Sequence, residues 1–132
     1  MNIVVVDAAN LAGEADFPML DLPKYGWQQF PALDDAELAE RCWRSDVIVT
    51  VATPIDRAVL DKSFKLALIV AAGADYGHID LDAARERGIT VCHVPGTNPA
   101  DAGDSARICA QVIDTIAAYL NGAAINRVDS VS

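Results

Sequence analysis

The sequence predicts an α/β fold, a flavodoxin-like and doubly wound sheet of five parallel strands with helices on both faces. Short apolar runs alternate with amphipathic segments along most of the chain. The runs are apolar at nearly every position, which is typical of strands buried on both faces of a parallel sheet. Right-handed crossovers and a weak second strand, suited to an edge, favour the strand order 2-1-3-4-5.

The predicted strands differ in composition. The first is a continuous β-branched run, and the third, fourth and fifth are similarly apolar. The second is rich in aromatic residues and less uniformly apolar, which favours an edge position. In chain order the predicted strands are Ile3–Val6, Tyr25–Phe30, Val47–Val51, Leu66–Ala71 and Thr90–His93.

Capping signals mark two of the helices between these strands. Asp34 is followed three residues later by a glutamate, which is a capping box that opens a helix to about Arg44. Asp80 caps a second helix over Leu81–Arg87, and Gly88 follows it at the position that favours a left-handed residue.

Two shorter helices have weaker signals. One is expected around Phe17–Leu20, inside a segment interrupted by Pro18 and Pro23. The other continues over Asp56–Leu60, with Pro54 placed where the first turn of a helix tolerates proline.

A long amphipathic helix is predicted over Ser105–Asn121. Asp101, Asp104 and Ser105 supply negative charge and a cap at its start, and Gly122 ends it. Apolar positions recur at helical spacing, so this helix is expected to dock on the sheet. The predicted stripe comprises Cys109, Val112, Ile113, Ile116, Ala117 and Leu120.

The chain is expected to form one domain, residues 1–132, built from three stretches. Residues 1–98 carry the alternation of strands and helices, residues 99–104 form a short join, and residues 105–132 carry the last helix and a tail. The apolar fraction of 52% with 22% charged residues indicates a compact globule.

The composition also argues against two kinds of partner, nucleic acid and a lipid bilayer. A net charge of −9 argues against nucleic acid, which requires a basic face, and no apolar run is long enough to span a membrane. The odd number of cysteines, Cys42, Cys92 and Cys109, within apolar stretches indicates buried free thiols and a cytoplasmic location. No histidine or cysteine pair has the spacing of a metal site.

Several segments, in order, resemble the substrate domain of D-isomer-specific 2-hydroxyacid dehydrogenases. In that family a dinucleotide-binding domain lies between the two ends of this domain, whereas here the join at residues 99–104 takes its place. The clean register of the surviving ends favours an engineered excision over a natural deletion. The matching segments are Val6–Asn10, Thr53–Ile55, Leu68–Asp80, Ala83–Gly96 and Ala118–Val128.

The resemblance implies a binding loop and an enzyme of origin. Backbone amides at Ala72, Gly73 and Ala74 would face the carboxylate of a small 2-oxo or 2-hydroxy acid, at the edge where parallel sheets bind ligands. Asp75 departs from the family pattern and opposes binding of an anion. The parent enzyme would use NAD or NADP.

The chemistry of that enzyme is missing from this chain. It has no G-x-G-x-x-G motif, and neither His78 nor His93 matches the family's catalytic position. We therefore expect no catalytic, cofactor-binding or metal-binding residues, weak acid binding and no activity for the isolated chain. A non-catalytic flavodoxin-like binding or scaffold domain remains the alternative. A receiver domain or an FMN carrier would need acidic or phosphate-binding loops that are absent.

The expected state of association is mainly monomeric at low concentration. The segments Thr53–Ile55, Ala72–Tyr76 and Val94–Gly96 should form one exposed surface at the carboxyl ends of three strands, but their few apolar side chains do not compel a dimer. Strain in the short join would let the last helix dock on a neighbouring copy, giving a minority of swapped dimer.

Overall fold

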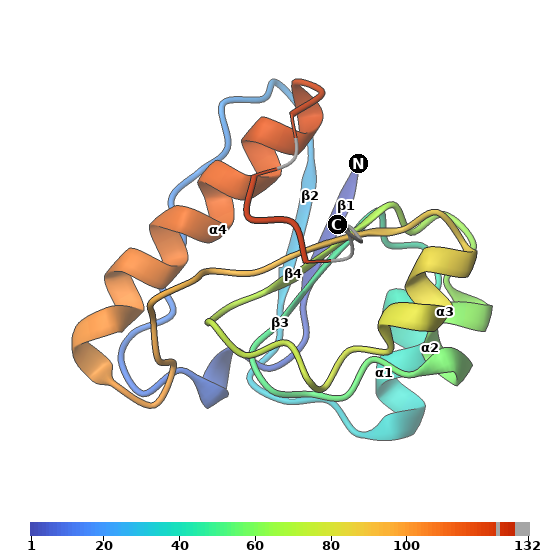
Figure 1. Ribbon diagram of the computed structural model, residues 1–132, viewed down its shortest axis with the longest axis horizontal. Coiled ribbons are helices and arrows are strands. Elements are labelled where there is room, and N and C mark those ends of the chain that lie inside the picture. Colours follow the sequence, from blue (N-terminus) through green and yellow to red (C-terminus); the bar gives the residue numbers. More distant parts are fainter. Residues whose placement is uncertain (124, 129–132) are drawn as a thin grey trace.

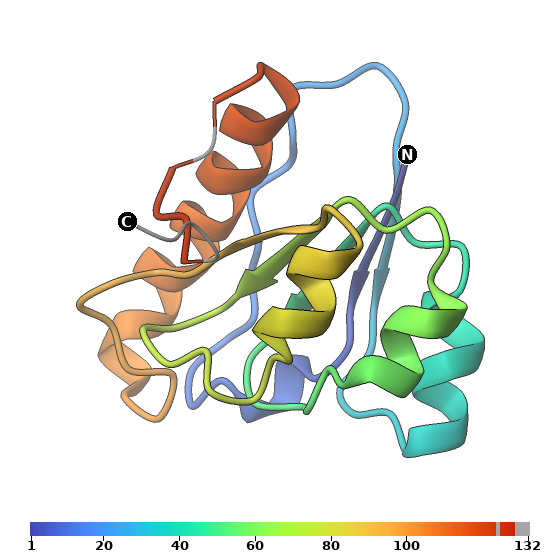
Figure 2. The same cartoon turned by 45° about the vertical axis from the view of Figure 1, so that its right-hand side comes forward.

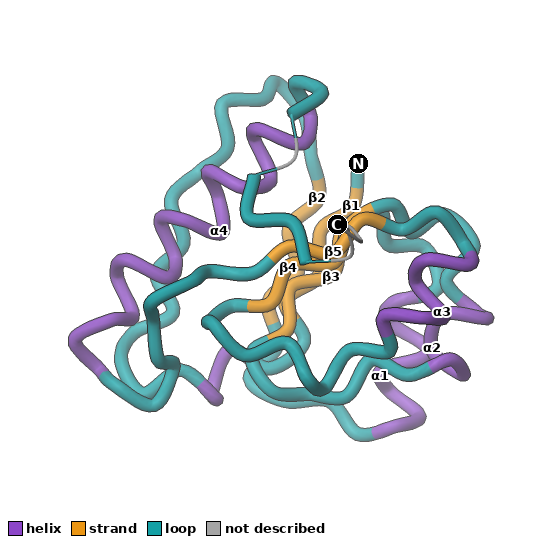
Figure 3. Tube along the Cα trace, viewed as in Figure 1, coloured by secondary structure: helices purple, strands orange, loops and turns teal. Residues whose placement is uncertain are grey.

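The computed structural model of the chain describes residues 1–123 and 125–128, and it contains a sheet of five parallel strands. The strand order β2-β1-β3-β4-β5 confirms the predicted fold class and order (Figure 1; Figure 3). The strands are β1 Asn2–Val5, β2 Gly26–Gln29, β3 Val47–Thr50, β4 Leu68–Ala71 and β5 Thr90–Cys92. The helices are α1 Asp35–Cys42, α2 Arg57–Lys62, α3 Leu81–Glu86 and α4 Ser105–Leu120, with 3₁₀ turns η1 Ala8–Asn10 and η2 Ala102–Asp104.

The helices cover both faces of the sheet. α1, α2 and α3 lie together on one face, and α4 lies on the other (Figure 1; Figure 2). Because side chains alternate along a strand, Ile3 and Val5 pack on the α4 side while Val4 and Val6 pack on the side of the three shorter helices. This double burial explains why the strands are continuous apolar runs.

The apolar stripe of α4 forms much of one core. Its predicted members Cys109, Val112, Ile113 and Ile116 are buried, as is Ile108, which the predicted stripe omits. Ala117 and Leu120 are only partly buried, because they lie beyond the sheet toward the loop at residues 20–22. No helix within the described residues has the length and apolar character needed to cross a bilayer.

The join ahead of α4 is a regular turn held by its own hydrogen bonds. The Asn98 amide donates to the Asp104 carboxylate at 2.9 Å, and the Asp104 amide donates to the Asp101 carbonyl at 3.0 Å. The carbonyl of Pro99 accepts from the Ala12 amide at 2.8 Å, which ties the join to the loop after β1. α4 is thereby delivered onto the sheet of its own chain.

Two helix predictions are wrong in detail. Phe17–Leu20 contains no helix, because the prolines favour extended backbone and the apolar side chains make tertiary contacts instead. Phe17 packs against Trp27 with ring centroids 5.3 Å apart. Pro54 also lies outside the first turn of α2, since the neighbouring Ile55 pairs with Ile79 in extended conformation.

The capping predictions are confirmed for α1 and α3, whereas the predicted cap at the start of α4 is wrong, because the Asp104 side chain accepts no amide of that helix. Asp34 and Glu37 form a reciprocal capping box at the start of α1, and the Asp80 carboxylate accepts from the Ala83 amide at 3.0 Å. Gly88 and Gly122 follow α3 and α4 with φ of 69° and 85°, the left-handed conformation that ends a helix and favours glycine.

The fold predicts that shortening a buried side chain in the α4 stripe greatly lowers the free energy of unfolding. Ile108→Ala should lower the free energy of unfolding by about 2–5 kcal/mol, because it opens a cavity between α4 and the sheet. Asp114→Ala, on the exposed side of the same helix, should change it by less than about 0.5 kcal/mol. Urea unfolding of both variants is the measurement. A cooperative, equally stable chain that lacks everything after Gly103 would contradict the role assigned to α4.

Candidate functional site

The segments after β3, β4 and β5 meet at the carboxyl edge of the sheet, as expected. The Ile55 amide donates to the His78 carbonyl at 2.9 Å, and the Val94 amide donates to the Gly73 carbonyl at 2.9 Å. These bonds join loops that lie far apart in sequence. The edge therefore presents one surface, which we call the carboxyl-edge surface, comprising residues 53–55, 72–78 and 93–97.

The three residues predicted to bind a carboxylate differ in what their amides do. The Ala72 amide donates to the Thr50 carbonyl at 2.9 Å, and the Ala74 amide donates to the Thr97 carbonyl at 3.3 Å. Within the described residues, no acceptor pairs with the Gly73 amide. Of the predicted set, Gly73 is the residue whose amide has no acceptor among the described residues, and the residue itself is buried.

Position 73 accommodates only glycine. A Cβ there would lie 2.6 Å from Cγ of Pro99 and 2.8 Å from its Cδ. The join thus packs directly on the candidate binding loop, and the absence of a side chain permits the contact. The short join at residues 99–104 therefore has a local consequence, because the ring of Pro99 lies beside the loop.

Asp7 organises the base of this edge. Its carboxylate is 1% exposed and accepts the amides of Val51, Ala52 and Thr53 at 2.7, 2.8 and 2.8 Å. The Thr53 hydroxyl donates to the same carboxylate at 2.8 Å. The sequence analysis assigned Asp7 no role. A single acidic residue directly after a fully apolar strand was the available signal, because a charge at that position must find buried donors.

His78 lies next to this carboxylate with one ring nitrogen unsatisfied. Its Nε2 is buried without a hydrogen-bond partner among the described residues. Burial lowers the pKa of His78, while Asp7, Asp75 and the Thr50 backbone act in the opposite direction. The imidazole is therefore neutral at physiological pH.

The second histidine supports the loop. The Nδ1 of His93 lies 2.9 Å from the Ala74 carbonyl, and its ring meets that of Tyr76 edge-on with centroids 5.2 Å apart. Asp75 is exposed and accepts from the Gly77 amide at 2.9 Å, so its negative charge remains beside the loop. That charge opposes the binding of an anion at this edge.

The thiols take no part in this surface as nucleophiles. Cys42, Cys92 and Cys109 are all buried, as predicted, and none forms a disulfide within the part of the chain that the structure describes. Burial raises the pKa of Cys42 to about 12 and also raises the pKa of Cys109. No group of three metal-ligating side chains occurs in the part of the chain that the structure describes.

Residues 4–129 match the family model for the catalytic domain of D-isomer-specific 2-hydroxyacid dehydrogenases. The chain belongs to this family. Its resemblance in residues 68–96 therefore reflects membership of a dehydrogenase family, and its fold is the fold of one domain of those enzymes.

Named relatives share modest identity with this dehydrogenase-family chain. A putative 2-hydroxyacid dehydrogenase of Haemophilus influenzae is 28% identical over 73% of this chain and 30% of its own length. A hydroxypyruvate reductase of Blautia hydrogenotrophica is 28% identical over 80% of this chain and 34% of its own length. The chain thus spans about a third of the length of these relatives.

Solved structures of similar fold also match about three quarters of this chain and about a third of their own length. A Thermus thermophilus protein superposes with a TM-score of 0.58 and 31% identity over 73% of this chain and 31% of its own. The NAD⁺-bound 3-phosphoglycerate dehydrogenase of Entamoeba histolytica superposes with a TM-score of 0.59 over 73% of this chain and 33% of its own, at 23% identity. At this identity, the similarity to the Entamoeba histolytica structure supports the fold alone.

Replacing the buried carboxylate should destabilise the protein strongly. Asp7→Asn should lower the free energy of unfolding by about 3 kcal/mol, because the amide group replaces an acceptor with a donor that faces other donors. Asn10→Ala is the matched control, since the Asn10 side chain donates to the same carboxylate from the exposed side at 2.9 Å. It should cost about 1 kcal/mol or less. Equal losses in urea unfolding would contradict the role of Asp7.

The buried imidazole predicts a pH dependence of stability. The pKa of His78 is lowered from 6.5 in the folded chain, so below that pH the unfolded chain binds the proton more readily. The stabilising contribution of neutral His78 is present above pH 6.5 and is lost as the pH falls through the lowered pKa. When the pH falls from about 7 to about 5, the melting temperature of the His78→Asn variant should therefore fall less than that of the wild type. Identical pH profiles would contradict this.

Proposed function

We propose that this chain is the substrate domain of an NAD(P)-dependent oxidoreductase acting on D-2-hydroxy acids, and that it is inactive alone. The observation that carries the proposal is the free Gly73 amide at the carboxyl-edge surface, in a chain that belongs to this dehydrogenase family. An N–H donor without an acceptor suits one oxygen of a substrate carboxylate, and in this chain that donor belongs to a buried glycine packed against Pro99.

The helix N-termini do not fit the phosphates of a dinucleotide. Each α-helix is preceded by an aspartate, namely Asp34, Asp56, Asp80 and Asp104. The first three accept amides of their own helices at 2.8, 3.1 and 3.0 Å. A pyrophosphate would have to displace carboxylates from these donors and would be repelled by them. We therefore assign the cofactor site of the parent enzyme to a separate domain.

Neither histidine at this surface is placed for the acid–base chemistry of 2-oxo acid reduction. Proton donation to the substrate oxygen needs a titratable group that faces the substrate and is held in position. His78 has its unpaired nitrogen buried, and His93 has Nδ1 on the Ala74 carbonyl. These contacts support a binding and positioning role for the domain.

We expect this chain to bind the acid weakly. The Gly73 amide offers a single hydrogen bond, and Asp75 lies close by. The guanidinium of Arg107 reaches this surface at the Gly96 carbonyl, 3.2 Å away, but it is also held by the Asp104 carboxylate at 3.0 Å. One neutral donor contributes about 1 kcal/mol net, so the dissociation constant for a simple 2-oxo acid should be millimolar or weaker.

The purified chain should not reduce glyoxylate, hydroxypyruvate or pyruvate with NADH or NADPH above a blank rate. Titration with pyruvate, followed by amide NMR, should shift the Gly73 resonance more than that of Gly88, which lies at the far end of α3. Turnover would refute inactivity. A silent Gly73 at about 50 mM pyruvate would refute the binding role and favour a non-catalytic scaffold domain.

A further inference from the structure

The outer edge of β2 carries unpaired main-chain groups. Gly26 and Phe30 direct their amides to β1, at 2.7 Å from the Met1 carbonyl and 2.9 Å from the Val5 carbonyl. Main-chain groups alternate in direction along a strand, so those of Trp27 and Gln29 face away from the sheet. Their N–H and C=O groups have no partner within the residues that the structure describes.

The opposite edge of the sheet is closed. The segment at residues 126–128 runs antiparallel beside β5, with an isolated bridge between Cys92 and Arg127. The Val128 amide donates to the Val91 carbonyl at 2.9 Å, and the His93 amide donates to the Asn126 carbonyl at 3.1 Å. An incoming strand therefore finds free hydrogen-bonding groups at β2 and not at β5.

We propose that two copies of this chain associate through β2, pairing antiparallel across a two-fold axis to form one continuous sheet. Trp27 of each copy then lies opposite Gln29 of the other, and both outward donors meet both outward acceptors. A strand of one copy cannot add to β5 of another, since that edge is covered, so the assembly closes at two rather than extending as a fibre.

The side chains along β2 suit a second copy better than a charged partner. The strand reads Gly-Trp-Gln-Gln and has no charge, so it brings no repulsion of its own to a self-pairing. Devices that usually protect an edge, such as a lysine, a proline or a bulge within the strand, are absent from β2. Antiparallel pairing across the axis also brings the two Trp27 indoles to the same face of the joined sheet.

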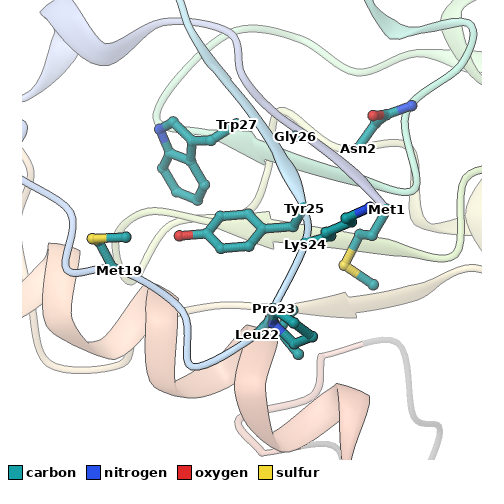
Figure 4. A pocket seen from close by; sticks show the side chains of 9 residues that line it. All are labelled: Met1, Asn2, Met19, Leu22, Pro23, Lys24, Tyr25, Gly26 and Trp27. Carbon is teal, nitrogen blue, oxygen red and sulfur yellow. The ribbon is translucent and has the colours of Figure 1, made fainter.

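An open hollow with both polar and apolar lining borders the same edge. Its volume is about 670 Å³, and Met19, Leu22 and Trp27 are among the residues that line it. In Figure 4 the rings of Tyr25 and Trp27 lie on one side of β2 and point toward Met19, whose side chain is 85% exposed in the free chain. Pairing at β2 would cover part of this surface and add apolar burial to the main-chain hydrogen bonds.

The association should be weak and should strengthen with salt. Four-residue strands bury a small interface, and two copies of net charge −9 repel one another over the range that salt screens. A dimer formed by exchange of α4 would behave differently, because it must unfold to dissociate and would not depend on β2.

Sedimentation equilibrium from about 10 µM to about 1 mM chain, at low and moderate salt, tests the proposal. The wild type should show a monomer–dimer equilibrium that is tighter at moderate salt. Gln29→Pro removes an outward N–H and leaves the β1 pairing intact, and it should weaken dimerisation at least about tenfold. Gln29→Val loses the same side-chain contacts but keeps the N–H, and it should change the dissociation constant less than about threefold.

Amide exchange gives a second readout that does not depend on any variant. Exchange at Trp27 and Gln29 should slow as wild-type concentration rises, while exchange at exposed amides of the 76–78 loop should not change. A wild type that stays monomeric to about 1 mM, or a dimer equally stable in Gln29→Pro, would overturn the proposal. So would concentration-independent exchange at both residues.

Discussion

A buried carboxylate needs donors, and Asp7 obtains them from the three consecutive amides that follow β3. This one cluster ties the end of β1 to the turn after β3, and it fixes where residues 51–53 leave the sheet. His78 lies within electrostatic range of this carboxylate, and the Ile55 amide donates to the His78 carbonyl. The Asp7 carboxylate therefore sets the position of the carboxyl-edge surface by holding backbone amides in place, and it has no reactive role in this arrangement.

Double burial of the sheet is the second constraint, and it explains why α4 is indispensable. Three short helices cover one face, whereas the other depends on α4 and the loop at residues 11–25 (Figure 1; Figure 2). In this chain the join brings α4 back within a few residues of Gly96. The same join places Pro99 against Gly73, so the return of the helix and the shape of the candidate binding loop are set together.

Aspartates that stabilise the fold also limit its chemistry. Those at the helix N-termini satisfy free amides and complement the helix dipoles, and for the same reason these ends are unsuited to phosphate. Asp75 adds negative charge beside the Gly73 amide. The chain belongs to the D-isomer-specific 2-hydroxyacid dehydrogenase family. Its proposed role is to position an acid, whereas the groups for hydride and proton transfer are assigned by the same proposal to a separate domain.

The sequence alone determined the strand order, the capped helices and the α4 stripe, because apolar periodicity and capping are local properties that survive without knowledge of the partner elements. It misassigned Phe17–Leu20, where contact with Trp27 outweighed helix propensity. It also missed the role of Asp7 and did not distinguish Gly73 from Ala72 and Ala74. Those differences depend on which amides find acceptors across the fold. Such pairing joins residues more than twenty positions apart, and only the assembled tertiary structure decides it.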